Sequence, residues 1–199
     1  MNQQIILASG SPARRALLGA TGLKFDVVPA ELDEEAASAP LEESNAEPAD
    51  IAAALALVKA LSVSERHPGA LVIAADQTLE CEGQLFRKAA DMAEARRQLL
   101  RLSGKTHFLH AAIACAENGQ IIYETQESAA ITLRHLAPEE VGRYFAFVGE
   151  QILSSVGLYH LEGPGIRLME RIEGDYFTIL GMPMLPLLSF LRGRGIGTF

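Results

Sequence analysis

The segment ASGSPARR, at positions 8–15, contains residue types that could bind an anion. The small residues Ser9, Gly10 and Ser11 leave backbone N–H groups uncovered, and the start of a helix adds unpaired donors at the positive end of its dipole. Arg14 and Arg15 add guanidinium groups whose paired donors suit phosphate oxygens. The segment favours an anion site, although a plain strand–turn–helix connection with two solvated arginines would have the same pattern.

Asp76 is the sharpest single candidate for catalysis or metal binding. It follows the apolar run Ala70–Ala75, which is typical of a central strand buried on both faces. Open α/β sheets bind ligands outside the carboxyl ends of their strands, which is where this carboxylate is predicted to lie. An aspartate that only begins a turn before Gln77 is the competing interpretation. The acidic stretch Asp33–Glu35 offers further carboxylates for a hard cation, or is simply a solvated charge cluster.

The segment Ser103–Thr106 reads SGKT, which is the end of the phosphate-binding P-loop pattern GxxxxGK[ST]. The first glycine of that pattern would have to stand at position 99, which is Leu99 in a helical repeat. A P-loop also follows a strand and opens a helix, whereas this segment is predicted to close a helix and precede a strand. The sequence therefore gives little support to a kinase or ATPase, and Ser103-Gly104 is predicted to be a helix stop.

Strands and helices alternate along the chain, which predicts an α/β fold. Apolar runs and turn residues place strands at residues 5–8, 25–29 and 70–75, and two long strands around the turn Glu117–Gln120. Capping residues, prolines and apolar spacing place helices at residues 13–20, 49–66, 91–101, 138–148 and 186–192. The acidic, Ala- and Pro-rich residues 30–48 are predicted to be an exposed loop. The long antiparallel pair makes the predicted sheet mixed.

Composition is that of an ordinary globular protein and argues against several classes of function. With 199 residues, 49% hydrophobic and 21% charged, the chain is predicted to form a single domain over residues 1–199. Its net charge of −8 argues against a nucleic-acid polymer as partner. No apolar run approaches the roughly 18 residues of a membrane span, and the N-terminal run is too short for a signal peptide, so we expect a cytoplasmic protein without membrane contact. Cys81 and Cys115 lie far apart and are predicted to be buried thiols.

The chain resembles the Maf family of nucleotide pyrophosphatases along almost its full length. Each matching motif is weak alone, but the set occurs in the family's order and spacing. The signature Ser-x-Ser-Pro-(x)-Arg-Arg matches residues 9–15, and the strand ending in Ala-Asp-Gln matches residues 75–77. The other matches are Asp33-Glu34, the helix lysine Lys59, the lysine Lys88, the stretch Leu102–His107 and the tail 172–183.

The resemblance implies hydrolysis of a nucleoside triphosphate to the monophosphate and pyrophosphate, a house-cleaning of the nucleotide pool that uses Mg²⁺ or Mn²⁺. By resemblance the catalytic residues are Asp76, Lys88 and Glu34, of which Glu34 and Asp76 would hold the metal. The triphosphate would be bound by Ser9, Ser11, Arg14, Arg15 and Lys59. The implied fold is a twisted mixed sheet with flanking helices in two lobes around a central cleft, as in inosine triphosphate pyrophosphatases. Family members are often dimeric, so a homodimer is part of the expectation.

Three positions resemble the family branch that acts on 7-methyl-GTP: the extra residue Ala13, together with Gln77 and Glu162. The thymidine and uridine triphosphate branch instead has Pro directly before Arg-Arg and Thr after the Asp. The chain departs from the family pattern at Ala13, where an aromatic is common, and at Ala89 and Ala111. These departures leave an alternative open, a nucleotide-binding regulatory protein with weak or no hydrolytic activity.

Overall fold

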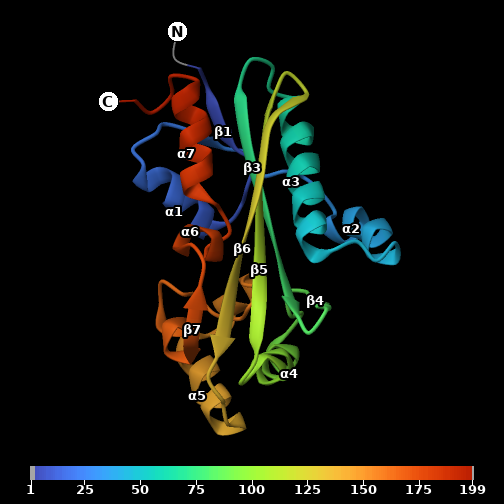
Figure 1. The fold of residues 1–199 in the computed structure, drawn as a ribbon, viewed down its shortest axis with the longest axis vertical. Helices are drawn as coiled ribbons and strands as arrows, with labels where there is room; N and C mark the ends of the chain where they lie inside the picture. Colours follow the sequence, from blue (N-terminus) through green and yellow to red (C-terminus); the bar gives the residue numbers. More distant parts are fainter. Residues whose placement is uncertain (1–2, 199) are drawn as a thin grey trace. The chain divides into compact units, whose positions relative to one another are not determined.

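The computed structural model describes residues 3–198, which form a seven-stranded sheet with flanking helices (Figure 1). The strands are β1 (Ile5–Leu7), β2 (Asp26–Val27), β3 (Leu71–Cys81), β4 (Gln84–Phe86), β5 (Thr106–Glu117), β6 (Gln120–Leu133) and β7 (Met169–Glu173). The helices are α1 (Pro12–Ala20), α2 (Glu34–Glu43), α3 (Pro48–Ser64), α4 (Met92–Leu102), α5 (Pro138–Val148), α6 (Tyr176–Ile179) and α7 (Met184–Gly193), with the 3₁₀ turns η1 (Glu150–Ser154) and η2 (Pro164–Leu168).

The sheet is mixed, as predicted. Its order is β2-β1-β3-β5-β6-β7, and β4 pairs with β3. β1 is parallel to β2 and to β3, whereas the β3–β4 and β6–β7 pairs are antiparallel. The predicted α/β class with a mixed sheet and flanking helices is therefore confirmed.

The described chain divides into two compact units. The first unit contains the chain up to Gln77, the segment His110–Glu127 and the segment from Asp175 onward. The second unit contains Thr78–Leu109 and Ser128–Gly174. The strands β3, β5 and β6 consequently run from one unit into the other. The expectation of one domain over residues 1–199 stays a prediction.

In the first unit, β1 and the first half of β3 are buried on both faces, which explains their continuous apolar sequences. On one face Leu7 and Ile73 pack with residues of α1 and α7. The helix α3 covers the opposite face (Figure 1). There Ile6 and Val72 pack against its small side chains Ala52, Ala56 and Ala60. The single lysine of α3, Lys59, stands next to this alanine surface.

The second unit contains two tight turns, of which the helix stop at Gly104 was predicted from the sequence. Glu82 and Gly83 both have positive φ, 54° and 75°, and join β3 to β4 as a tight hairpin. α4 ends at Leu102, and Gly104 follows with a φ of 69°. A side chain at Gly104 would come within 2.4 Å of the His135 ring. The SGKT segment is therefore a helix end, and the rejection of a P-loop is confirmed.

Two predictions of local structure were wrong. Residues 30–48 are not a continuous loop, because α2 forms within them. Asp33 caps this helix by accepting the N–H of Ala36 at 3.0 Å, and acidic residues in the first turn interact favourably with the helix dipole. The strand predicted at 70–75 does not end before Asp76 but continues to Cys81. The remaining predicted helices and strands are present, with shifts of a few residues at their ends.

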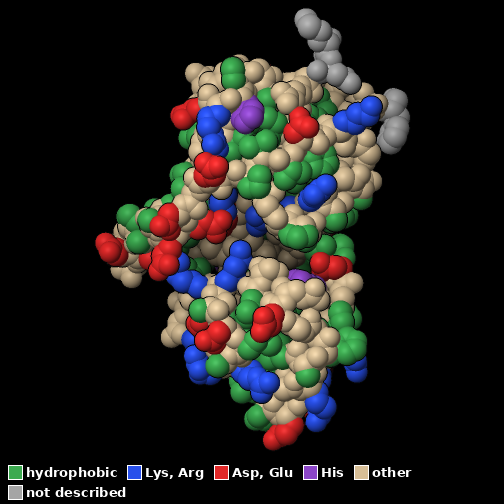
Figure 2. All heavy atoms as spheres, turned by 180° about the vertical axis from the view of Figure 1, so that it is seen from behind, with side chains coloured by type: hydrophobic (Ala, Val, Ile, Leu, Met, Phe, Trp, Pro, Cys, Tyr) green, Lys and Arg blue, Asp and Glu red, His purple; other side chains and the backbone are tan. Residues whose placement is uncertain are grey.

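Acidic and basic side chains are interspersed on the surface drawn in Figure 2, and both cysteine thiols are buried. Among the described residues, no helix combines the length and the apolar character that a membrane crossing needs. On the face drawn in Figure 2, Lys and Arg side chains are scattered among acidic ones, and no continuous basic surface covers it. Cys81 and Cys115 are free and buried, as predicted, and burial raises the pKa of Cys115 to about 12.

Candidate active site

The turn between β1 and α1 presents hydroxyl and backbone donors. Ser9 is buried, and its Oγ accepts the N–H of Ser11 at 3.3 Å. Ser11 is the N-cap of α1, and its side chain accepts the N–H of Arg14 at 3.4 Å. Gly10 is exposed, and its N–H donates no hydrogen bond within residues 3–198. The turn therefore leaves a free backbone donor beside a helix start, which is the arrangement that an anion site uses.

Arg14 is anchored by backbone carbonyl groups of its own unit. Its Nη1 donates to the carbonyl of Ala75 at 2.7 Å, and its Nε donates to the carbonyl of Gly181 at 2.9 Å. Desolvation lowers the pKa of Arg14, and the carboxylates of Asp76 and Glu34 oppose this shift. Arg14 nevertheless stays positively charged at neutral pH, because the guanidinium group does not lose its proton in proteins. Arg14 therefore connects α1 to β3 and to the residues after α6, and it brings a positive charge to the end of the β1–α1 turn.

Lys59, Asp76 and Glu34 form one ionic cluster. Lys59 and Asp76 are buried, with exposed fractions of 7% and 6%. The Lys59 Nζ forms ion pairs with the Asp76 Oδ1 and, at 2.6 Å, with the Glu34 Oε1. The Glu34 side chain is half exposed, at 54%. The structure thus brings together three of the predicted site residues, which come from α2, α3 and β3.

The alternation of β3 explains why Asp76 meets Lys59. Residues two apart on a strand share a face, so Asp76 lies on the face of Val72 and Ala74, which packs against α3. Ala75 lies on the opposite face with the residues that pack on α1 and α7. The prediction that Asp76 lies beyond the end of its strand was wrong. Its carboxylate is available because it faces a lysine of α3, not because the strand stops there.

Gln77 lies on the face opposite to Asp76 and contacts α6. Its Nε2 donates to the carbonyls of Thr178 and Ile179 at 3.0 and 3.1 Å. Asp175 caps α6 by accepting the Thr178 N–H at 2.9 Å. The α6 turn and the adjoining Gly181 are thus held by two of the predicted site residues, Gln77 and Arg14. Residue-by-residue reasoning missed this role, although the family-like tail 172–183 pointed to the right segment.

The carboxylates of Glu34 and Asp76 fit a divalent metal ion. Both contact the same ammonium group, so both already converge on one cation. Mg²⁺ is commonly held by only one or two carboxylates, with water and substrate phosphates as its other ligands. Within residues 3–198, no group of three or more His, Cys, Asp or Glu residues could hold a metal without such help. The donor set matches a metal that arrives with a phosphate substrate better than a resident structural metal.

Four predicted residues lie outside these contacts. Arg15 is exposed and Ala13 is half-buried, both in the first turn of α1. Lys88 is exposed and follows β4 in the second unit. Glu162 is exposed in the segment between η1 and η2, also in the second unit. Their roles toward a substrate stay predictions.

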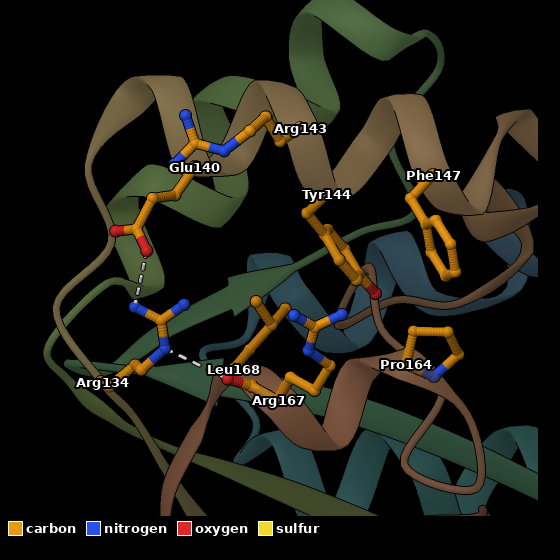
Figure 3. A pocket seen from close by; sticks show the side chains of 8 residues that line it. All are labelled: Arg134, Glu140, Arg143, Tyr144, Phe147, Pro164, Arg167 and Leu168. Carbon is orange, nitrogen blue, oxygen red and sulfur yellow. Dashed lines mark hydrogen bonds and ion pairs between the residues drawn. The ribbon is translucent and has the colours of Figure 1, made fainter.

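A separate cavity of about 330 Å³ lies within the second unit (Figure 3). It is lined by Arg134, Glu140, Arg143, Tyr144, Phe147, Pro164, Arg167 and Leu168. An ion pair of 3.0 Å between Arg134 and Glu140 closes one side of it. None of the predicted site residues lines this cavity.

Proteins of known sequence and structure resemble this chain over nearly its whole length. The 7-methyl-GTP pyrophosphatase of Mesorhizobium japonicum is 51% identical over 98% of both chains. The 7-methyl-GTP pyrophosphatase of Brucella abortus is 50% identical over 96% of both, and the nucleoside triphosphate pyrophosphatase of Granulibacter bethesdensis is 45% identical over 95% of this chain and 96% of its own. The solved structure of a nucleoside triphosphatase (dITP/XTP pyrophosphatase) from Mycobacterium abscessus matches with a TM-score of 0.46 and 17% identity, over 97% of this chain and 96% of that chain. The family model for Maf-like proteins matches residues 4–194, and the chain belongs to the Maf-like protein family.

Proposed function

We propose that this chain hydrolyses a nucleoside triphosphate to the nucleoside monophosphate and pyrophosphate, with a divalent metal ion, and that it prefers 7-methyl-GTP. The observation that carries the proposal is the convergence of Glu34 and Asp76 on one cation beside the β1–α1 turn. The names of the relatives, 7-methyl-GTP pyrophosphatase and nucleoside triphosphate pyrophosphatase, support the same reaction.

The residues of the first unit can perform the steps that this reaction requires. The Asp76 carboxylate orients a water molecule toward the α-phosphorus and accepts its proton. The new bond joins the water oxygen to the α-phosphorus, and the bond from that phosphorus to the bridging oxygen breaks, which releases pyrophosphate. Mg²⁺ or Mn²⁺ held by Glu34 and Asp76 would neutralise charge on the reacting phosphate.

Cationic and backbone donors would bind the triphosphate. The free N–H of Gly10, the Ser11 hydroxyl and the exposed Arg15 lie at or near the start of α1. Lys59 has a flexible four-carbon side chain, so its ammonium group can leave the carboxylates and bind a phosphate oxygen. Lys88 would add another charge. These contacts involve phosphates only, so they should serve every nucleoside triphosphate equally.

The preference for 7-methyl-GTP would depend on Glu162. Its carboxylate can accept hydrogen bonds from both N1–H and the 2-amino group of guanine. Methylation at N7 gives the base a positive charge, which a nearby carboxylate favours. Gln77 would act on the base through the α6 carbonyls that it holds. Ala13 has no ring to stack on the cationic base, so we expect the preference to be modest.

The test is a hydrolysis screen over 7-methyl-GTP, GTP, UTP and dTTP with Mg²⁺, with Mn²⁺ and with chelator. Release of pyrophosphate that chelation abolishes supports the proposal, and highest activity on UTP or dTTP would overturn only the base preference. Tight nucleotide binding without pyrophosphate release would instead identify a regulatory binding protein. Release of orthophosphate would contradict the reaction. Size-exclusion chromatography with light scattering tests the expected homodimer.

A further inference from the structure

The segment that carries Glu162 is held more tightly than an ordinary surface connection. It runs from Ser155 to Gly163, between η1 and η2. We call it the 155–163 loop. Leu158 and Tyr159 within it are buried, with exposed fractions of 0% and 4%. Leu158 has a φ of 60°, which is unusual for a bulky residue and persists only where the surroundings enforce it.

A hydrogen-bonded pair of rings anchors this loop to the sheet of its unit. The Tyr159 hydroxyl and the His107 Nε2 are 2.6 Å apart, and the ring centroids are 5.7 Å apart. His107 lies on β5 and is fully buried. Burial lowers the pKa of His107 to about 4 and raises that of Tyr159, so both rings are neutral near pH 7. The Nδ1 of His107 has no partner within the described residues, so Tyr159 is the one side chain bonded to this imidazole.

The backbone around Tyr159 is shaped to its ring. A Cβ atom at Gly157 would lie 2.7 Å from the Tyr159 ring. A Cβ atom at Gly165 would lie 2.5 Å from the His160 carbonyl oxygen and 2.8 Å from the Tyr159 Cβ. Both distances are too short for any side chain, so glycine is required at each position. The Tyr159 ring therefore excludes a side chain at Gly157, and the chain at Tyr159 and His160 excludes one at Gly165.

Two further hydrogen bonds hold the loop carbonyls. The Ser155 hydroxyl donates to the Tyr159 carbonyl at 2.8 Å, within the loop. The Tyr144 hydroxyl donates to the Leu158 carbonyl at 3.1 Å, and Tyr144 points from α5 toward η2 (Figure 3). Glu162 itself is exposed and has no hydrogen bond within the described residues. Its position depends on the backbone of the loop.

We propose that His107 and Tyr159 are positioning residues that fix the 155–163 loop and thereby present the Glu162 carboxylate for base recognition. This inference rests on the proposed base preference. The pair acts on discrimination between bases and leaves phosphate binding and the chemical step unchanged, because its hydrogen bond joins the loop to β5 and involves none of the residues proposed to bind phosphate or metal. The contribution of the pair differs from that of Glu162 itself, because losing the pair would move the Glu162 carboxylate without removing its charge.

The first variant is Tyr159→Phe, which keeps the ring that fills the space beside Gly157 and removes only the hydroxyl. We expect KM for 7-methyl-GTP to rise about fivefold to tenfold, the size of effect of one lost hydrogen bond, with kcat and the UTP kinetics within about twofold of wild type. The matched control is Tyr123→Phe, because Tyr123 stacks on Phe190 in the other unit at 4.3 Å. That control should leave all these values unchanged.

Two more measurements separate this inference from the base preference. Amide hydrogen exchange should accelerate in the 155–163 loop of Tyr159→Phe and not of Tyr123→Phe, whether or not any nucleotide is hydrolysed. In a Glu162→Gln background, Tyr159→Phe should cause no further loss of selectivity.

Unchanged exchange in the loop would overturn the positioning role. Faster exchange with unchanged selectivity would overturn its link to Glu162, as would equal losses for 7-methyl-GTP and UTP. A wild-type protein without preference for 7-methyl-GTP would refute the base preference and with it this link, while the exchange result would still decide the anchoring.

Discussion

Replacing Asp76 by Asn should stop turnover and should also destabilise the fold. Asp76 and Lys59 are both buried, and Asn would leave the Lys59 ammonium with a single carboxylate, that of the half-exposed Glu34. Breaking a buried ion pair by removing one charge typically costs about 3–5 kcal/mol. Glu34 and the remaining Asn oxygen retain part of the interaction, so we expect about 2–3 kcal/mol, close to the contribution of a charged hydrogen bond. That loss corresponds to a melting temperature lower by about 5–10 °C for a chain of this size.

The matched variants are Lys59→Met and the double variant Lys59→Met with Asp76→Asn. Removing both charges leaves no unpaired buried ion, so the double variant should be more stable than Asp76→Asn alone. Urea unfolding followed by circular dichroism at pH 7 without metal measures the three free energies. Pyrophosphate release measures turnover, for which Asp76→Asn should lose a factor of about a hundred or more.

Two results would refute this reasoning. If the free energy of unfolding of Asp76→Asn equals that of wild type, the buried pair contributes nothing and the geometry of the cluster is wrong. If folded Asp76→Asn turns over at a near-normal rate, Asp76 has no catalytic role. A double variant less stable than Asp76→Asn would contradict the coupling between the two charges.

Three further predictions concern the arginines, the base and pH. Arg14→Ala and Arg15→Ala should each lower kcat/KM by a similar factor for every triphosphate, and in at least one variant the loss should correspond to about 1.5–3 kcal/mol of transition-state stabilisation. Only Arg14→Ala should also lower thermal stability, because Arg14, unlike Arg15, donates to backbone carbonyl groups. Wild-type kinetics in both variants would show that the two arginines are solvated and bind no phosphate. Glu162→Gln should reduce kcat/KM for 7-methyl-GTP more than for UTP, and an equal effect on both would exclude base recognition by this residue. Burial lowers the pKa of His107 from 6.5 to about 4, so as the pH falls the imidazole of the unfolded chain is protonated at a higher pH than that of the folded chain. The contribution of the neutral His107 to the free energy of unfolding should be complete above pH 6.5 and should fall by on the order of 3 kcal/mol as the pH drops toward 4. Unfolding measured at a series of pH values should show a weaker dependence on pH in His107→Asn than in wild type.

Local sequence patterns predicted most of the fold because they report local physics. The apolar run 70–75 indicated a doubly buried strand, and the turn residues around Gly119 indicated the long hairpin. The same reasoning failed at Asp76, because a polar residue inside a strand is indistinguishable by itself from one that ends it. It failed at α2 because the acidic sequence and Pro40 resemble a loop, while the cap at Asp33 and the contacts with α3 favour a helix.

The partners of the site residues were beyond local reasoning. Arg14 bonds to the carbonyl of Gly181, which lies 167 positions later in the chain. Backbone carbonyls leave no trace in the residue types, so only the fold reveals such a bond. The pairing of Lys59 with Asp76 and Glu34 depends likewise on how α2 and α3 pack beside β3. Residue types singled out the β1–α1 turn and Asp76, the family resemblance added Lys59, Lys88 and Glu162, and the structure adds the contacts that connect several of them.

The discontinuity of the first unit affects how the protein can fold during synthesis. The side chains of Leu7 and Ile73 complete their packing only with Leu187 and Leu191 of α7. The ribosome therefore has to release every residue up to α7 before this core can close, and the apolar strands made first stay open to aggregation or to chaperones until then. The 78–109 and 128–174 segments of the second unit emerge within that interval. A pause in translation just before α7 should consequently burden folding of this protein more than a pause just after α7 has emerged.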